Sequence, residues 1–242
     1  MERAGATGGR EREGATGDRK REGATGGREN VVDAVIEDYA RRHSSPEAPH
    51  LADVAEETRG ATRAPEMMVG QLEGGFLAML VHMLQPRLVL EIGTFTGYSA
   101  LSMAAALPPE GRIITCEIDE THASIARRHI AASPFADRID MRLGPAADTI
   151  ASLDGPFDLV FIDADKTGYH GYYEAVLPKL ADSGVIAVDN VLWNRLVLGP
   201  PDGQDDDTRA LVAFNDHVVD DERVECVMLT VRDGVTLVRR RR

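Results

Sequence analysis

Two short apolar runs, each ending in an aspartate, decide the fold of this chain: Phe157-Asp-Leu-Val-Phe-Ile-Asp163 and Gly184-Val-Ile-Ala-Val-Asp189. Such runs are typical of buried parallel strands, and the segment between them is long enough for a helix. As neighbouring strands they would lie about 5 Å apart, with both aspartates at the carboxyl edge of the sheet, where open α/β sheets bind ligands. Asn190 follows directly. Two carboxylates and an amide oxygen at one edge predict a site for a hard divalent cation.

Strands and helices alternate on both sides of this unit. The predicted strands span 88–92, 112–117, 138–143, 157–162 and 185–188. The predicted helices that follow them span 98–107, 119–131, 145–153, 169–180 and 207–219. Segments 223–231 and 235–239, joined by Asp233-Gly234, form a closing hairpin. The pattern predicts an α/β fold: a Rossmann-like, doubly wound, mostly parallel seven-stranded sheet with an antiparallel C-terminal hairpin and helices on both faces.

The N-terminal part of the chain has a different composition. Residues 1–29 hold three copies of a nine-residue unit that begins Gly-Ala-Thr-Gly, without any Leu, Ile, Val or aromatic residue. Such a segment buries too little surface to offset its ordering entropy, which predicts a disordered tail; a tail that docks on a partner is the alternative. One domain then covers 30–242: N-terminal helices over 30–64, with Asn30 as the first N-cap, and a core over 65–242 that opens with a helix over 65–84.

Composition narrows the class of protein. The 242 residues are 43% hydrophobic and 28% charged, which suits one sizeable α/β domain. The net charge of −13 argues against nucleic acid as a partner. We find no apolar run near the roughly 20 residues that span a bilayer, and no signal-peptide core, so we expect a cytoplasmic protein without a membrane partner. Cys116 and Cys226 are then expected as buried free thiols.

A glycine-rich turn follows the first strand, in Glu91-Ile-Gly93-Thr-Phe-Thr-Gly97-Tyr-Ser99. Its glycine spacing is not that of a dinucleotide-binding turn, and the lysine of a P-loop is absent. Glu91 would repel a phosphate, whereas Glu117, at the end of the next strand, is placed to accept ribose hydroxyls. The pattern favours a nucleoside ligand with positive charge. The alternative is a plain tight turn beside a solvated strand end.

Three segments carry a family resemblance: 91–99, Phe161-Ile-Asp-Ala-Asp-Lys166 and Asp189-Asn-Val-Leu-Trp-Asn194. In residues and order they resemble the cation-dependent class I O-methyltransferases that use S-adenosylmethionine, the caffeoyl-CoA and catechol O-methyltransferase-like family. The resemblance runs from about residue 65 to the C-terminus. It implies S-adenosylmethionine, a divalent cation (Mg²⁺, or another such as Mn²⁺ or Ca²⁺), a phenolic small-molecule acceptor with vicinal hydroxyls, and a homodimer.

The resemblance also implies roles for individual residues. The cofactor contacts would be Val69, Glu91, Gly93, Thr94, Ser99, Glu117, Ala146, Asp163 and Asp165. Val69 stands where many relatives have Thr, so a backbone contact would serve there. The metal ligands would be Asp163, Asp189 and Asn190. Lys166 and Asp163 would be catalytic, with Lys166 as base or charge stabiliser, and Asn194 and Trp193 would touch the substrate.

These roles suit the chemistry. A phenol has a pKa near 10, and a cation bound to both oxygens of a vicinal diol lowers that pKa and fixes the geometry. Simpler roles stand beside them: Lys166 as a surface ion-pair partner, Asp165 as a helix N-cap, and Trp193 as a core residue.

Other features are interpreted as structural. Asp205-Asp-Asp207 is read as a solvated loop that caps the next helix through Asp207 rather than as a second metal site. The seven histidines show no ligand spacing. Three tyrosines are expected to pack their helix onto the sheet: Tyr169, Tyr172 and Tyr173.

Two rival functions remain. A nicotinamide-dependent oxidoreductase on a similar sheet is opposed by the absent third glycine and by Glu91. A non-catalytic cofactor-binding protein is opposed by the intact set of Asp163, Asp189 and Asn190.

Overall fold

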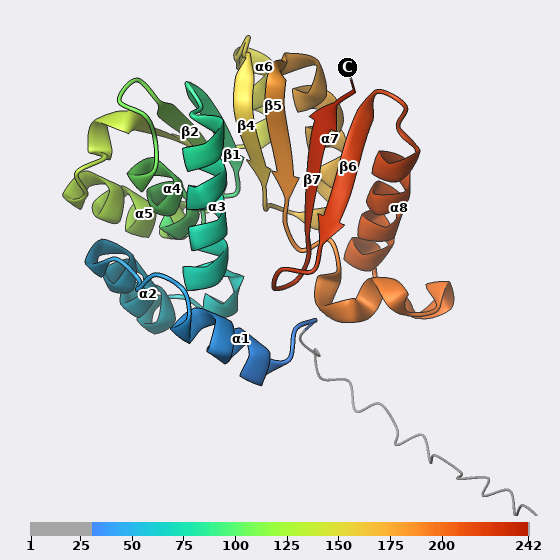
Figure 1. Ribbon diagram of the computed structural model, residues 1–242, viewed down its shortest axis with the longest axis horizontal. Helices are drawn as coiled ribbons and strands as arrows, with labels where there is room; N and C mark the ends of the chain where they lie inside the picture. The colour runs from blue at the N-terminus through green and yellow to red at the C-terminus, as the bar shows by residue number, and fades with distance from the viewer. Residues whose placement is uncertain (1–30, 242) are drawn as a thin grey trace, which may run out of the picture.

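A seven-stranded sheet forms the centre of the computed structural model, which describes residues 31–241 (Figure 1). The strand order is β3-β2-β1-β4-β5-β7-β6. The strands are β1 (Leu88–Ile92), β2 (Arg112–Glu117), β3 (Ile139–Leu143), β4 (Phe157–Ile162), β5 (Leu180–Val188), β6 (Val224–Leu229) and β7 (Val235–Arg240). Strands β1 to β5 pair in parallel, and β7 runs antiparallel between β5 and β6. The predicted doubly wound sheet with its antiparallel hairpin is confirmed; the predicted tail, 1–29, lies outside the described residues.

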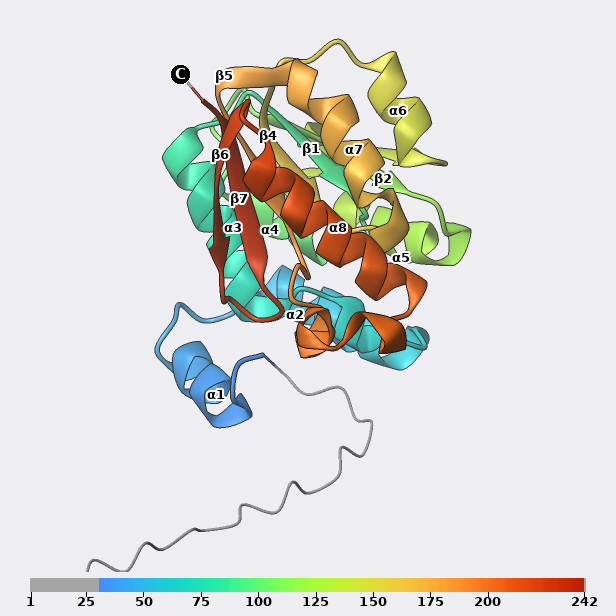
Figure 2. The same cartoon turned by 90° about the vertical axis from the view of Figure 1, so that its right-hand side faces the viewer.

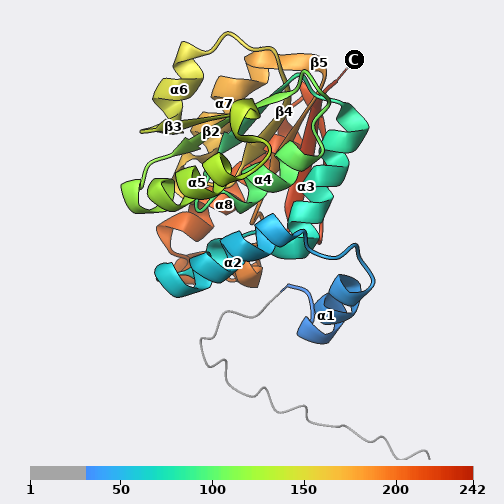
Figure 3. The ribbon, with the colours of Figure 1, turned by 90° about the vertical axis from the view of Figure 1, so that its left-hand side faces the viewer.

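Helices cover both faces of the sheet. The α-helices are α1 (Ala34–Arg42), α2 (Pro49–Ala61), α3 (Gly70–Leu84), α4 (Tyr98–Ala105), α5 (Glu120–Ala132), α6 (Ala146–Ser152), α7 (Tyr169–Val176) and α8 (Asp206–Asp220). The 3₁₀ turns are η1 (Pro65–Met67), η2 (Ala136–Arg138), η3 (Lys166–Gly168), η4 (Leu177–Lys179), η5 (Trp193–Leu198) and η6 (Pro201–Gly203). One apolar cluster joins the sheet to α6, α7 and α8, and a second joins it to α2, α3, α4 and α5. Figures 2 and 3 show these two layers from opposite sides.

Helix α1 begins later than predicted. Asp33 caps α1, because its side chain accepts a hydrogen bond from the Val35 N–H at 2.8 Å. Helix α2 begins at Pro49, whose fixed φ suits a first helical position. The predicted helix over 65–84 is broken into η1 and α3, because Met68 is extended and Gly70 has a φ of +69°.

Two other expectations were wrong. Helix α8 is capped by Asp205, not Asp207, since Asp205 Oδ1 accepts from the Thr208 N–H at 2.8 Å. Cys226 is exposed, because β6 is an edge strand with an open face, whereas Cys116 in the central β2 is buried.

The segment Pro65–Leu84 is long and apolar enough to span a membrane by length and composition alone, contrary to the sequence-based expectation. In the fold it is partly buried: Leu77, Leu80 and Val81 belong to the apolar cluster under the sheet. Met79 and Met83 on the opposite side of α3 are exposed.

The chain reverses its direction of travel across the sheet between β1 and β4. It runs from β1 outward to β2 and β3, then returns to place β4 on the other side of β1. Such a switch point is where open α/β sheets bind ligands, outside the carboxyl ends of the strands. The segment after β5, drawn in orange with η5 and η6, lies at the lower end of the sheet in Figure 1.

Candidate active site

The three residues predicted to bind a metal lie at the carboxyl ends of neighbouring strands. The Asp163 N–H, just after β4, donates to the Ile92 carbonyl of β1 at 2.9 Å, and the Asp189 N–H, just after β5, donates to the Ile162 carbonyl at 3.0 Å. Asp189 is 2% exposed, and its Oδ1 has no hydrogen-bond partner among the described residues. A buried carboxylate oxygen without a donor is poorly satisfied, which suits a site completed by a cation.

Lys166 lies against this set of oxygens. Its Nζ donates to Asp163 Oδ1 at 3.1 Å, to Asn190 Oδ1 at 2.8 Å and to the Tyr169 hydroxyl at 2.6 Å. The same ammonium lies 5.4 Å from the centre of the Trp193 ring. Lys166 is only 7% exposed, so it is not a surface ion-pair partner. Its three donors are all engaged here, so a hydrogen bond to an acceptor oxygen would replace one of these three.

Tyr169 is part of the site and not only of the core. Its hydroxyl accepts from Lys166 and donates to the Asp189 carbonyl at 3.1 Å. Burial, and then the charge of Asp163, raise the pKa of Tyr169 well above its usual value, so the hydroxyl stays protonated. The expectation that this tyrosine only packs was therefore incomplete.

Sequence reasoning missed Glu73. This residue of α3 is 1% exposed, and its Oε2 lies 3.1 Å from Arg232 Nη1. Burial first, and then the Asp189 carboxylate, raise the pKa of Glu73 well above its usual range. Burial and the charge of Asp163 likewise raise the pKa of Asp189 to about 7. The signal available in the sequence was a lone acidic residue inside the apolar segment 67–84.

Val69, at the N-cap of α3, is positioned by the same arginine. Arg232 Nη1 donates to the Val69 carbonyl and, at 3.2 Å, to the Met68 carbonyl. The guanidinium therefore ties the hairpin between β6 and β7 to the start of α3. Val69 is 5% exposed.

Glu91 is the buried acid on the cofactor side of the site. It is fully buried in β1, its Oε2 accepts a hydrogen bond from the Thr115 hydroxyl, and its Oε1 has no partner within residues 31–241. Burial raises the pKa of Glu91 to about 8, while the hydroxyls of Ser99, in the first turn of α4, and of Thr115 oppose the rise. A ligand that carries an ammonium or hydroxyl donor would satisfy the free oxygen.

Gly93 packs directly against the backbone of Asp163. It has a φ of +101°, and a Cβ on it would lie 2.0 Å from the Asp163 carbonyl oxygen, so only glycine fits. Its N–H and that of Thr94 both donate to the Cys116 carbonyl, at 3.1 and 3.0 Å. The turn thus joins β1 to β2 and β4 and leaves no side chain between the strand ends.

Glu117 holds the glycine-rich turn through its carboxylate. One oxygen accepts from the Phe95 N–H at 2.7 Å, and the other accepts from the Ile118 and Asp119 N–H groups at 2.9 and 2.8 Å. At 7% exposed, it does more than solvate a strand end. Its remaining lone pairs are the ones that a ribose would use. Ala146 is the first residue of α6 and is 9% exposed.

Asp165 and the segment after Asn190 complete the predicted set. Asp165 is exposed and accepts from the Tyr172 hydroxyl at 2.6 Å. It occupies the N-cap position of η3, as the capping alternative expected, but its side chain makes no capping hydrogen bond. Trp193 and Asn194 have φ values of +47° and +51°, and the Asn194 N–H donates to Asp233 Oδ1 at 2.6 Å. Left-handed non-glycine residues held by a side chain are typical of functional loops.

Comparisons with known proteins point to one family. A family model described as O-methyltransferase matches residues 41–241. The chain is 34% identical over 209 residues to a probable caffeoyl-CoA O-methyltransferase of Dictyostelium discoideum, covering 83% of this chain and 89% of that protein. It is 38% identical over 181 residues to a caffeoyl-CoA O-methyltransferase of Eucalyptus globulus, covering 69% and 72%. A methyltransferase structure from Podospora anserina with bound S-adenosylhomocysteine superposes with a TM-score of 0.80 at 29% identity, covering 86% and 94%.

Proposed function

Since the chain belongs to the O-methyltransferase family and is an S-adenosylmethionine-dependent enzyme, we propose that it methylates one hydroxyl of a vicinal dihydroxy aromatic small molecule with the help of a divalent cation, preferentially Mg²⁺. The nicotinamide-dependent oxidoreductase and the non-catalytic cofactor-binding protein give way to this function. The acceptor class follows from the two oxygens that a catechol offers to one hard ion.

The observation that carries the metal proposal is the donor set itself. Asp163, Asp189 and Asn190 supply only oxygen ligands, from adjacent strand ends, and Asp189 Oδ1 is buried without a partner in the described chain. Mg²⁺ prefers oxygen donors and keeps open positions for substrate oxygens and water. When bound, the ion would lower the pKa of the acceptor hydroxyl, and the cofactor would supply an electrophilic methyl group on its sulfonium.

The side chains around this set would position the acceptor and move its proton. Lys166 lies against oxygens of Asp163 and Asn190, where its ammonium would stabilise the oxyanion. To act as the base instead, it would first have to lose its own proton, and the neutral amine would then accept that of the hydroxyl. Trp193, whose ring faces that ammonium, would form an aromatic wall of the acceptor site, and Asn194 would contact the acceptor. Much of the acceleration would come from positioning.

The cofactor contacts are proposed on the same basis. Glu91 would receive a cationic or hydroxyl donor through its free oxygen, and Glu117 would accept from the ribose. Gly93 and Thr94 would let the backbone approach the ligand, and Ser99 would line it from the start of α4. The remaining contacts would come from Val69, Ala146, Asp163 and Asp165.

The decisive experiment measures methyl transfer to a panel of catechols, flavonoids and caffeoyl compounds, with product analysis. We expect turnover with Mg²⁺, loss of turnover in EDTA and recovery on adding Mg²⁺. Asp163→Ala should abolish transfer, whereas Asp202→Ala, in the exposed turn η6, should leave it unchanged. Undiminished turnover in EDTA would rule out the metal mechanism. Separately, cooperative thermal unfolding of Asp163→Ala would show that the variant remains folded.

A homodimer is proposed from the resemblance of the chain to its family. Light scattering during size-exclusion chromatography measures it directly. A mass near twice the 26.3 kDa of one chain is the expected result, and a single-chain mass across the working concentration range is the contrary one.

A further inference from the structure

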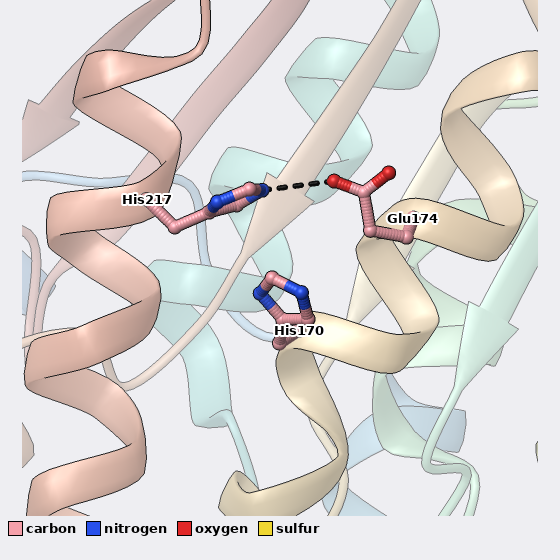
Figure 4. Close-up of side chains that lie close together, drawn as sticks. All are labelled: His170, Glu174 and His217. Atoms are coloured by element: carbon pink, nitrogen blue, oxygen red, sulfur yellow. Dashed lines mark hydrogen bonds and ion pairs between the residues drawn. The ribbon is translucent and has the colours of Figure 1, made fainter.

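Two histidines and a glutamate gather on the outer helix layer, away from the residues of the proposed active site. His170 and Glu174 lie on α7 and His217 on α8, and the three side chains converge between the two helices in Figure 4. One ligand atom from each residue lies within 4.8 Å of the other two. The interpretation that the histidines show no ligand spacing therefore fails here. The sequence does not reveal this group, because His217 lies on α8, far along the chain from the two residues on α7.

Helix geometry explains why these side chains meet. His170 and Glu174 are four residues apart on α7, so they share one face of that helix. His217 lies in the last turn of α8, and its Nε2 is 2.8 Å from Glu174 Oε1. The His170 and His217 rings lie 4.4 Å apart between centroids. Tyr173 packs edge to face against His217, which fixes the ring.

We propose that His170, Glu174 and His217 bind a transition-metal ion, with Zn²⁺ as the best match. Two imidazoles and one carboxylate are a donor set of zinc sites that leave a fourth position for water. Zinc–ligand distances of about 2.0–2.2 Å require ligand atoms about 3.3 Å apart, so small side-chain rotations suffice to close the present spacing. Imidazole donors also separate this site from the oxygen-only set of the proposed active site, which suits Mg²⁺.

A second layer of charged groups orients the carboxylate. Arg223 Nη2 donates to Glu174 Oε1 at 2.6 Å and Nη1 donates to Oε2 at 3.1 Å, and Arg223 is itself held by Asp221 at 2.7 Å. These hydrogen bonds hold the Glu174 carboxylate in place beside His217. Such outer-layer partners fix ligand geometry. The guanidinium charge opposes the ion, so binding is expected to be moderate rather than extreme.

A metal ion bound to these three residues would link α7 and α8, the two helices that flank the proposed active site. Helix α7 begins at Tyr169, immediately after Lys166–Gly168, and α8 packs against both that turn and η5. The side chain of His170 is exposed and those of Glu174 and His217 are about one-third exposed, so an ion can reach them from solvent. An ion that binds only the folded protein also raises its stability by mass action.

The test uses the chelator-stripped full-length chain carrying Asp189→Ala, which disables the proposed Mg²⁺ site. Wild-type protein in excess Mg²⁺ provides the same comparison if that variant folds poorly. Co²⁺ is titrated while its visible absorption is recorded, and Zn²⁺ is then added as a competitor. We expect one equivalent of Co²⁺ with tetrahedral-type bands, displaced by Zn²⁺, and a rise in Tm with Zn²⁺ but not with Mg²⁺.

Variants of the three ligands distinguish a site from surface adsorption. His170→Ala changes an exposed side chain and should weaken Co²⁺ binding by about 100-fold, as should His217→Ala and Glu174→Gln. His129→Ala is the matched control, because His129 also pairs with a glutamate, Glu57, at 2.8 Å, and belongs to no such three-residue group within residues 31–241. Absence of Co²⁺ and Zn²⁺ binding would overturn the proposal. So would binding that survives both His170→Ala and His217→Ala.

Discussion

The ammonium of Lys166 donates a hydrogen bond of 2.8 Å to the side-chain oxygen of Asn190, one of the oxygens that the proposed metal ion would bind. Lys166 Nζ also reaches Asp163 Oδ1, so one buried cation already contacts two of the three proposed ligands. A divalent ion bound to these carboxylate and amide oxygens would therefore compete with the ammonium of Lys166 and would repel it.

Replacing this lysine should separate metal binding from turnover. In Lys166→Met the competing and repelling charge is gone, so Mg²⁺ or Mn²⁺ should bind at least several-fold more tightly. Methyl transfer should fall by about 10²–10⁴-fold, the usual contribution of a positioned proton-transfer group. Calorimetric titration of Mn²⁺ and initial rates measure the two effects. Lys179→Met is the control, since Lys179 donates to the Ile150 and Leu153 carbonyls elsewhere in the fold. Weaker metal binding in Lys166→Met would contradict the competition.

Gly93→Ala should damage both folding and cofactor binding. The added Cβ would lie 2.0 Å from the Asp163 carbonyl oxygen, at a φ of +101° that alanine resists. We expect a loss of about 3 kcal/mol or more in unfolding free energy, measured by urea denaturation, and no measurable S-adenosylhomocysteine binding. In Gly75→Ala, an exposed mid-helix position of α3 with nothing within 4 Å of a Cβ, stability should rise by up to about 1 kcal/mol. Equal behaviour of the two variants would refute the packing argument.

Glu91→Gln should remove a pH dependence of stability. Burial raises the pKa of Glu91 from its ordinary 4.5 to about 8, so the folded chain prefers the neutral acid. That stability is complete below pH 4.5 and is lost as pH rises through 8, at up to about 1.4 kcal/mol per pH unit. Between about pH 5.5 and 8.5 the unfolding free energy of the variant should therefore rise by about 3 kcal/mol relative to that of the wild type, measured by denaturation without ligand. Exposed Glu120→Gln should follow the wild type at every pH. A pH-independent difference would show that Glu91 is ionised in the folded chain.

The pair Glu73 and Arg232 should respond unequally to substitution. Burial and Asp189 raise the pKa of Glu73, so glutamine mimics its neutral form and Glu73→Gln should cost under about 1 kcal/mol. Arg232→Ala leaves the Met68 and Val69 carbonyls without their donor and should cost about 2 kcal/mol. Thermal unfolding of both variants checks this order. Arg209→Ala, in an exposed pair with Asp206, should stay within about 0.5 kcal/mol of wild type. A larger loss from Glu73→Gln than from Arg232→Ala would mean that Glu73 is charged.

The sheet could be predicted well because its strands are local patterns. The predicted bounds of β1, β2 and β4 match the structure, since each is an unbroken buried run. Strand β5 begins earlier than predicted, at Leu180, because polar residues at its exposed start hide the extended segment. The metal set was visible for the same reason: it follows two such strands, and parallel strands end at one edge.

The rest of the site depends on contacts between segments far apart in the chain. Glu73 reaches the site only because α3 packs beside the β6–β7 hairpin that carries Arg232. His217 meets α7 only through the packing of α8. Tyr169 was visible as a buried aromatic residue, but its hydroxyl partners, Lys166 and the Asp189 carbonyl, depend on strand register. Periodicity carries none of this information.

The proposed metal ligands and the glycine-rich turn follow the carboxyl ends of three adjacent central strands, β1, β4 and β5. The N–H groups of Asp163 and Asp189 are themselves bonded across those strands, to Ile92 and Ile162. Local unfolding of a surface helix therefore leaves these residues in place, and only unfolding of the central strands separates them. Heat inactivation and global melting should then share one midpoint, with the two aspartate amides among the slowest to exchange with deuterium.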